Sequence, residues 1–399
     1  MSQLTARVRP VWRRRDRKDF WCLTGAISMV GLALGTLLPL TALALDRQGF
    51  SGATIGLIIA VHALGLVAAI GICEPAVQRY GARKTIEYAG LGAAATALFM
   101  QQLGNAWSLS VALFILGVLL GVVLNMVETW VNLAIPDAQR GRWLAVHCTL
   151  FTLFQLCGPL VLQCVSPARA FAVCAALMLL AWPVFRGLSQ RNLSDEAPHS
   201  DRQHDWPRDL RTAPVIVIST ALFALFDTLV LSLLPVYALA QGMDTPNALA
   251  SASVVLAGDT ALEIVVGAMA DRWGRVRVHT ACAAVLVGSA LLLPFTIATL
   301  FWWADLFVMG GAAGGIYVLS MMACGQRFSG SHLLRMTALL GSVWGVASIA
   351  GPLVTGALMA HASRWSLPSV IGAVAATLLW ALAYEQRQHP YSLELPTHV

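Results

Sequence analysis

The sequence predicts an all-α membrane protein in which twelve transmembrane helices form two pseudo-symmetric six-helix bundles. Of the 399 residues, 58% are hydrophobic and only 12% are charged, whereas a soluble domain carries about 25% charged residues. The chain therefore cannot cover a globule of this size with polar side chains, and the bilayer is its expected solvent. Twelve apolar segments, and a repeat that relates the first six to the last six, complete the prediction.

Each predicted helix is a run of about 20 mainly apolar residues, which is the length that crosses the hydrocarbon core. A short turn, Ser166 to Arg169, separates the fifth run from the sixth, and an aromatic turn, Phe301 to Asp305, separates the ninth from the tenth. The approximate limits are 20–45, 52–77, 86–104, 107–132, 143–165, 169–187, 213–240, 247–270, 278–299, 303–325, 334–360 and 366–384.

One long polar segment divides the twelve runs into two sets of six. It covers residues 189–211, is charged and contains proline, so we interpret it as the linker between two bundles. The predicted organisation is a basic tail over 1–19, an N-terminal bundle over 20–188, the linker over 189–211, a C-terminal bundle over 212–386 and a second tail over 387–399.

The Lys and Arg residues predict the orientation in the membrane. If the N-terminus is cytoplasmic, 23 of the 26 Lys and Arg residues lie in cytoplasmic segments, and the exceptions are Arg47, Arg169 and Arg364. The positive-inside rule then places both termini and the linker in the cytoplasm. The basic tail is explained as a topogenic signal, so no nucleic-acid partner is expected. The first apolar run is too long for the core of a cleavable signal peptide.

The two halves of the chain share small motifs at a constant spacing of 193 residues. Gln48-Gly49 matches Gln241-Gly242, and before that point the spacing is 196. A constant spacing held across four pairs of helices predicts two equivalent bundles related by an axis along the membrane normal. The other matched pairs are Arg79 with Arg272, Gly81 with Gly274, Gly117 with Gly310, Gly121 with Gly314, Arg142 with Arg335, Gly158-Pro159 with Gly351-Pro352, and Leu37 to Pro39 with Leu233 to Pro235.

The segment between the eighth and ninth runs carries a recognisable motif. It reads G-x-x-x-D-R-x-G-R and is formed by Gly267, Asp271, Arg272, Gly274 and Arg275. This motif resembles the loop signature of the major facilitator superfamily. Glycine permits a tight turn between helices, and Asp271 follows a helix C-terminus, where an anion is unfavourable. The anion therefore needs a cationic or donor partner, and such a contact can hold one conformation and release in another.

The first half carries a reduced copy of this gating motif. Only Arg79 and Gly81 are kept, while Glu74, Gln78 and Ala82 stand at the other motif positions. In the resembled family the first copy is usually the better preserved one, so this chain departs from the pattern. We therefore expect the second copy to carry the gate.

Two further features resemble the same family. The Gly-Pro pairs Gly158-Pro159 and Gly351-Pro352 are similar to its antiporter signature, and residues 128–145 resemble a prokaryotic subgroup of exporters. The resemblance covers nearly the whole chain. It implies a bacterial inner-membrane carrier that works as a monomer by alternating access, with helices one, four, seven and ten lining the cavity and no cofactor.

Ionisable side chains inside the predicted spans are candidates for function, because burying a charge in a bilayer is unfavourable. Asp227 and Asp259 lie midway along helices seven and eight, Glu263 lies somewhat deeper, and Glu128 lies near the cytoplasmic end of helix four. Asp259 and Glu263 are four residues apart and share a helical face. Two carboxylates so close in a poorly hydrated region should not both ionise readily, so at least one should hold a proton near neutral pH.

Three further polar residues are candidates for the same site. Asn125 and Asn132 form a stripe with Glu128 at helical spacing, and His62 lies midway along helix two. Each has a structural alternative: His62 can form an interhelical hydrogen bond, and Glu128 can pair with Arg140 or Arg142. Asp227 can likewise hydrogen-bond a neighbouring helix.

The eight cysteines predict neither a disulfide framework nor a metal site. They form no CxxC pair and mostly lie in apolar runs, so we expect small buried hydrophobic residues. They are Cys22, Cys73, Cys148, Cys157, Cys164, Cys174, Cys282 and Cys324.

The predicted function is secondary active transport of a small solute. No Lys or Arg lies in the middle of a span, which disfavours a strong anion as the solute and favours proton-coupled efflux of a cationic or neutral amphipathic compound. Proton-coupled uptake of a nutrient or siderophore-like solute is one alternative, and a non-transporting receptor is another. An enzyme is not expected, because the sequence contains no HExxH, GxSxG or Walker A motif.

Overall fold

A computed structural model of the chain describes residues 14–103, 105–135, 140–188, 213–297, 299–328, 330–361 and 364–388. Within these ranges the chain forms twelve long α-helices and one short 3₁₀ turn, η2 (Pro167–Arg169). Most of both predicted tails and the linker over 189–211 lie outside the described residues. The linker boundaries therefore stay predictions.

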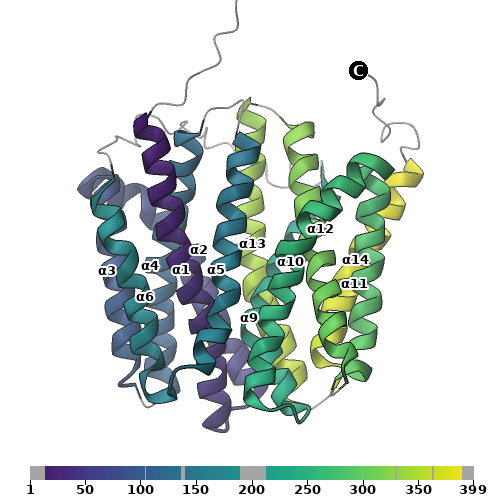
Figure 1. Cartoon of the computed structure of the whole chain (residues 1–399), viewed down its shortest axis with the longest axis horizontal. Coiled ribbons are helices and arrows are strands. Elements are labelled where there is room, and N and C mark those ends of the chain that lie inside the picture. The colour runs from purple at the N-terminus through teal and green to yellow at the C-terminus, as the bar shows by residue number, and fades with distance from the viewer. Residues whose placement is uncertain are drawn as a thin grey trace, which may run out of the picture.

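The first six helices lie together at the left and centre of Figure 1, coloured from purple to teal. Their bounds are α1 (Arg14–Arg47), α2 (Gly52–Tyr80), α3 (Ala82–Met100), α4 (Ala106–Ala134), α5 (Arg140–Gln163) and α6 (Ala170–Arg186). The second set is α9 (Pro214–Ala240), α10 (Thr245–Trp273), α11 (Arg275–Thr296), α12 (Phe301–Arg327), α13 (Gly330–Met359) and α14 (Ser366–Gln388).

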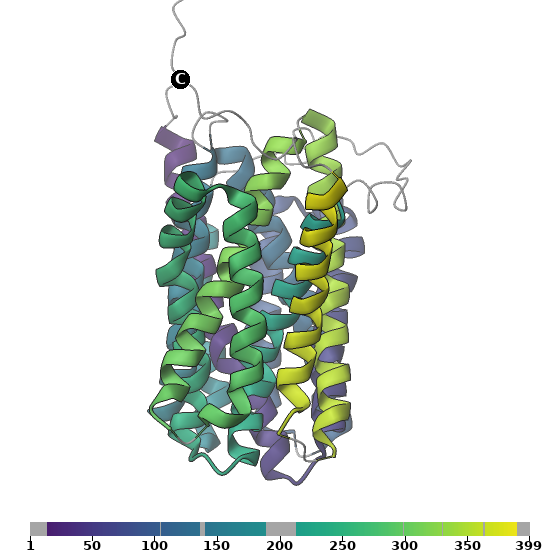
Figure 2. The same ribbon diagram turned by 90° about the vertical axis from the view of Figure 1, so that its right-hand side faces the viewer.

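The start of α1 and the end of α14 lie at the same end of the molecule, at the top of Figures 1 and 2. We call this the terminal end and the opposite one the distal end. In the described part of the chain, eleven helices are long and apolar enough to cross a membrane. Helix α3 falls outside this group because Arg83, Lys84 and Glu87 lie in its first two turns. All twelve predicted runs are helices, so the predicted all-α fold is confirmed.

Several helices extend beyond their apolar runs, because the backbone keeps its hydrogen bonds where the side chains become charged. Helix α1 begins at Arg14 instead of residue 20, and α3 begins at Ala82 instead of 86. The predicted aromatic turn after the ninth run is wrong: Phe301 begins α12, and the connection precedes it. Trp302 is completely buried, and its Nε1–H donates a hydrogen bond to Ser251 Oγ on α10 at 2.9 Å.

The tight turns repeat between the two halves as the sequence predicts. Gly81 alone joins α2 to α3 with φ +79°, and Gly274 alone joins α10 to α11 with φ +88°. Each glycine N–H caps the preceding helix, donating to Val77 O and Ala270 O respectively. A positive φ is strained for any residue with a Cβ, which explains why glycine stands at both equivalent positions.

Close helix pairs also repeat between the halves. Helix α2 packs on α4, where Gly65 faces the backbone of α4 and Gly117 faces the backbone of α2. Helix α10 packs on α12 in the same way, through Gly258 and Gly310. A Cβ at any of these four positions would clash with the facing backbone. The helices of each pair approach through small residues, as is common between transmembrane helices.

The two halves meet at the distal end along two seams. In the first, Gly52 and Gly56 of α2 lie against Pro352 and Gly356 of α13, so closely that a Cβ at Gly56 would clash with the Pro352 carbonyl. We call this the glycine seam.

The second seam joins α5 to α10. Ser253 Oγ–H donates to Leu156 O at 2.7 Å. Closer to the distal end, Gln163 Nε2–H donates to Pro246 O at 3.1 Å. The two seams are equivalent under the repeat, because α2 and α13 of the first correspond to α10 and α5 of the second.

Towards the terminal end the α2–α13 seam opens. Gly345 of α13 still touches Val67 of α2, but a Cβ at Gly71 or Gly341, about one turn further on, would meet no described atom within 4 Å. Both glycines are exposed. Among the described residues, the α2–α13 seam is therefore closed at the distal end and open towards the terminal end.

Candidate functional site

Carboxyl groups from both halves meet in one electrostatic cluster around Tyr317 of α12. The Tyr317 hydroxyl interacts electrostatically with Glu128 of α4, with Asp259 and Glu263 of α10, and with Cys148 of α5. Cys148 interacts in turn with Glu128 and Glu263. The cluster thus joins residues that lie more than 100 positions apart in the chain.

Two members of this cluster have accessible side chains. Glu128 and Cys148 are exposed, and both interact electrostatically with residues of the other half. Glu263 on α10 is half-buried and interacts with Cys148.

Asp259 differs from Glu263 although the two share a helical face. Its side chain is only 4% exposed and lies in the α10–α12 packing, where Oδ1 approaches Gly314 so closely that a Cβ there would clash. Among the described residues, no hydrogen-bond partner lies within reach of this Oδ1. Asp259 interacts electrostatically with Glu263 and with Asp227 of α9.

The repeat supplies an internal reference for Asp259. The equivalent position in the first half is Leu66 of α2, whose backbone lies against Gly121 of α4, whereas Asp259 places its side-chain Oδ1 against Gly314. The first half therefore carries a leucine where the second carries a carboxyl group. The fold of this helix pair does not require a carboxyl group.

Three aromatic rings flank the acidic cluster. Phe223 of α9 stacks on Tyr317 with ring centroids 4.7 Å apart and 14° between the planes. Trp344 of α13 stands edge-on to both rings, at 5.7 Å from Phe223 and 5.6 Å from Tyr317. Asp227 lies one helical turn beyond Phe223 on α9 and is half-buried. We call Phe223, Tyr317 and Trp344 the aromatic triad.

Sequence reasoning identified the acids of this site but not the triad or Cys148. Phe223 and Asp227 are four residues apart and share a face of α9, which is the one signal that the sequence offered. Aromatic residues occur throughout the apolar runs. Only their arrangement in space distinguishes these three.

The remaining polar candidates lie outside the cluster or in local bonds. His62 is 3% exposed and its Nδ1 lies 3.3 Å from Leu113 O, which joins α2 to α4. The Asn125 amide donates to Gly121 O of its own helix at 2.7 Å. Asn132 belongs to α4, but its side chain lies outside the described residues. Of the predicted candidates, the structure thus brings together Asp227, Asp259, Glu263 and Glu128.

The predicted gating motif lies at the terminal end of the molecule. Asp271 and Arg272 are exposed in the last turn of α10, Arg275 is half-buried at the start of α11, and Gly267 lies one turn before Asp271. Within the described residues the Asp271 carboxylate has no ion pair or hydrogen bond. In the reduced copy, Arg79 lies over the Tyr80 ring, with 5.5 Å between its Cζ and the ring centroid.

The two Gly-Pro pairs lie at helix contacts. Gly158 of α5 faces the backbone at Gly35 and Thr36 of α1, and Gly351 of α13 faces Leu225 of α9. Pro159 and Pro352 lie inside their helices. The pairs thus stand where each bundle packs its fifth helix on its first.

The cysteines correct one expectation. All eight are free, but only Cys174, Cys282 and Cys324 are buried, while Cys148, Cys157 and Cys164 are exposed. An apolar run contains lipid-facing and cavity-facing positions as well as core positions, so membership of a run does not predict burial. Within the described ranges, no group of three or more His, Cys, Asp or Glu side chains could hold a metal ion.

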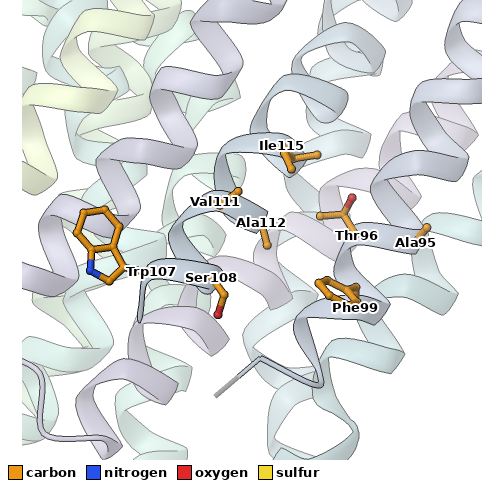
Figure 3. Close-up of a pocket in the computed structure, with 8 residues that line it drawn as sticks. All are labelled: Ala95, Thr96, Phe99, Trp107, Ser108, Val111, Ala112 and Ile115. Carbon is orange, nitrogen blue, oxygen red and sulfur yellow. The ribbon is translucent and has the colours of Figure 1, made fainter. Parts of the chain in front are cut away.

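A separate groove lies on the outside of the first bundle, between α3 and α4 near the distal end (Figure 3). Its volume is about 550 Å³. The lining is almost entirely apolar, and Trp107, Phe99 and Val111 are exposed there. Since none of the clustered carboxyl groups reaches it, we interpret this groove as lipid-facing surface.

Comparisons with known proteins agree with this architecture. The chain is 25% identical over 363 residues to the uncharacterized MFS-type transporter YfkF of Bacillus subtilis, which covers 86% of this chain and 88% of that protein. It is 23% identical over 367 residues to the uncharacterized MFS-type transporter YcaD of Escherichia fergusonii, with 92% and 95% covered.

The fold is similar to that of a solved transporter, and the sequence matches a family model. A mutant of the nucleoside transporter NupG superposes with a TM-score of 0.76 at 13% identity, covering 92% of this chain and 99% of that one. A sequence model named Major Facilitator Superfamily matches residues 20–258 and 249–397. Together the helical repeat, the fold and this match establish that the chain belongs to the Major Facilitator Superfamily, as a membrane transporter and not an enzyme.

Proposed function

We propose that this transporter exports a small cationic or neutral amphipathic compound in exchange for protons, by alternating access. The observation that carries the proposal is the combination of the aromatic triad with carboxyl groups from both halves. Aromatic faces and carboxylates both attract a cation, and the rings also offer apolar contact.

The charges around the site support this solute class. No Lys or Arg lies in the middle of any span, so an anionic solute would meet only acidic groups there. Glu128 of the first half and Glu263 of the second both interact electrostatically with Cys148 and Tyr317. A cation placed between them would replace its water shell with two carboxylates and the Tyr317 ring face.

The buried carboxyl group of Asp259 supports proton coupling. An ionised carboxylate with no partner would cost several kcal/mol in this setting, so we expect Asp259 to hold its proton in this conformation. A conformational change that separates α10 from α12 at Gly314 would hydrate the group and release the proton. Alternating hydration of this kind is what a proton-coupled carrier requires.

The proposed orientation in the membrane indicates which side of the membrane this conformation opens to. If the Lys and Arg asymmetry places both termini in the cytoplasm, the terminal end is cytoplasmic. The structure then corresponds to a state that is closed to the outside at both seams and open to the cytoplasm. Solute would enter from the cytoplasm and reach Glu128 and Glu263 first. The bilayer, protons and one small solute are the proposed partners of a monomer.

Transport in vesicles of defined orientation tests the proposal. We expect inverted vesicles with an acidic interior to accumulate a lipophilic cation such as ethidium, and to release protons from the interior as they do so. Accumulation in right-side-out vesicles driven by an acidic exterior would instead indicate uptake. A failure of any compound in a broad library to exchange in proteoliposomes would favour the receptor alternative.

The gating motif yields a separate prediction. Asp271 has no partner among the described residues in this conformation, so we propose that it makes its contact in the opposite one, as a helix-end anion requires. Asp271→Asn is expected to slow transport about tenfold, as loss of one hydrogen bond to a charged group would. Gln78→Ala, at the equivalent position of the first half, is the matched control. Equal loss in both variants at equal expression would show that the second copy carries no special role.

A further inference from the structure

The start of α1 presents a stripe of cations on its outer face. Arg14, Arg17, Lys18 and Trp21 follow the spacing of one helical face, and all four are exposed. Gly25 continues the stripe one turn further into the membrane. It is exposed as well, and a Cβ there would meet no described atom within 4 Å. Along this face the three cations are followed by the Trp21 ring and then by the exposed backbone at Gly25.

The acidic groups of this segment lie on the other side of the helix. Asp19 is 1% exposed, and its neighbours Phe20 and Leu23 are completely buried. Asp16 is half-buried. The outward face is thus cationic, and the nearby carboxylates do not point along it.

Two neighbouring helices frame the stripe. On one side Lys18 Nζ donates to Gly187 O, just after α6, at 3.4 Å, and Arg186 lies over the Trp182 ring at 4.9 Å. On the other side Trp21 stands edge-on to Trp143 of α5, with centroids 5.8 Å apart. The stripe faces outward between α5 and α6, away from the space between the two bundles.

We propose that this face binds the headgroup of an anionic phospholipid. Arg14, Arg15, Arg17, Lys18 and Trp21 line a surface hollow of about 590 Å³ at the terminal end. Arginine matches the oxygens of a phosphodiester with paired N–H donors. Trp21 sits where tryptophan is favoured, at the level of the headgroups. An acyl chain can lie along the bare backbone at Gly25.

The repeat indicates that the fold does not require these cations. The equivalent positions of α9 are Pro214 for Lys18, Val217 for Trp21 and Ala221 for Gly25. That helix begins and packs without a basic stripe. A topogenic role needs positive charge near the helix end, but it does not need the charges to share one face with a tryptophan and an open glycine.

Native mass spectrometry of the full-length protein in detergent tests the proposal, with phosphatidylglycerol and phosphatidylcholine of the same acyl chains as probes. In the triple variant Arg14→Gln, Arg17→Gln, Lys18→Gln, phosphatidylglycerol affinity is expected to fall by at least roughly tenfold, with phosphatidylcholine unchanged. The matched control is Lys84→Gln, Arg327→Gln, Arg387→Gln, which removes three exposed cations from other terminal-end positions. This control should change phosphatidylglycerol affinity by less than about twofold.

Further measurements distinguish loss of the lipid site from misfolding, and lipid binding from binding of free phosphate. The variant Arg14→Lys, Arg17→Lys keeps the charge but loses the paired donors, so it should weaken binding less than the glutamine variant does, and Trp21→Ala should weaken it with no change of charge. Equal losses in the two triple variants would reduce the effect to bulk surface charge and overturn the proposal. Displacement of the lipid by inorganic phosphate would also overturn it, because the site would then recognise phosphate alone.

Discussion

Asp259→Asn is expected to abolish pH-driven accumulation of the solute while leaving downhill exchange intact. One exchanged proton can support about a tenfold solute gradient for each pH unit, since one pH unit corresponds to about 1.4 kcal/mol. The amide cannot release a proton, so the accumulation ratio should fall to about one. It keeps the volume of the carboxyl group and so fits against Gly314. The measurement is accumulation against a pH step in proteoliposomes, beside counterflow of labelled solute.

The control for this variant is Leu66→Asn, which places the same amide at the equivalent position of the first half. It replaces an apolar side chain and so perturbs packing more than Asp259→Asn does, but it should leave coupling intact. Glu263→Gln and Asp227→Asn extend the series, because both groups interact electrostatically with Asp259. If all three acidic variants keep full pH-driven accumulation, the proton is carried elsewhere, and Glu128 becomes the next group to replace.

Gly56→Val is expected to slow transport strongly by preventing closure of the distal end. A side chain at this position would clash with the Pro352 carbonyl in the glycine seam. Overpacking of this kind costs about 1–3 kcal/mol, which would shift the balance roughly tenfold to hundredfold away from the conformation seen here. Transport rate is one readout. The other is labelling of Cys148, which is exposed in this conformation, in a variant whose other seven cysteines are serine.

In this single-cysteine background with Gly56 unchanged, Cys148 should react with a thiol reagent supplied from the terminal end. In Gly56→Val that reaction should slow, because the open space closes as the distal end opens. Gly288→Val on α11 is the control, since a Cβ at Gly288 meets no described atom within 4 Å. Unchanged transport and labelling in Gly56→Val would contradict the role of the glycine seam.

The sequence by itself determined the number of helices and the repeat. Both follow from local properties, because about 20 apolar residues must be helical to satisfy their backbone in a bilayer. The tight turns at Gly81 and Gly274 were equally visible, since only glycine tolerates their φ values. The intramembrane acids were found for the same reason: a carboxyl group in an apolar run is conspicuous wherever the run packs.

Only the tertiary structure decided what each of these groups meets. Asp259 and Glu263 share a helical face, yet one is buried against Gly314 and the other is half-buried and interacts with Cys148 of the other half. Their difference depends on how closely α12 approaches α10 at each level, and that distance is set by Gly310 and Gly314 on another helix.

The environments of the aromatic residues were likewise not predictable from the sequence. Trp302 was expected in an interfacial turn, but a serine on α10 accepts its N–H and allows complete burial. The aromatic triad comes from three different helices, and Cys148 of one bundle interacts electrostatically with Glu263 of the other. Hydrophobic length is a property of one segment and can be read along the chain. A binding site made by several segments depends on how each helix is rotated and how closely it packs, and those are fixed only when all the helices are assembled.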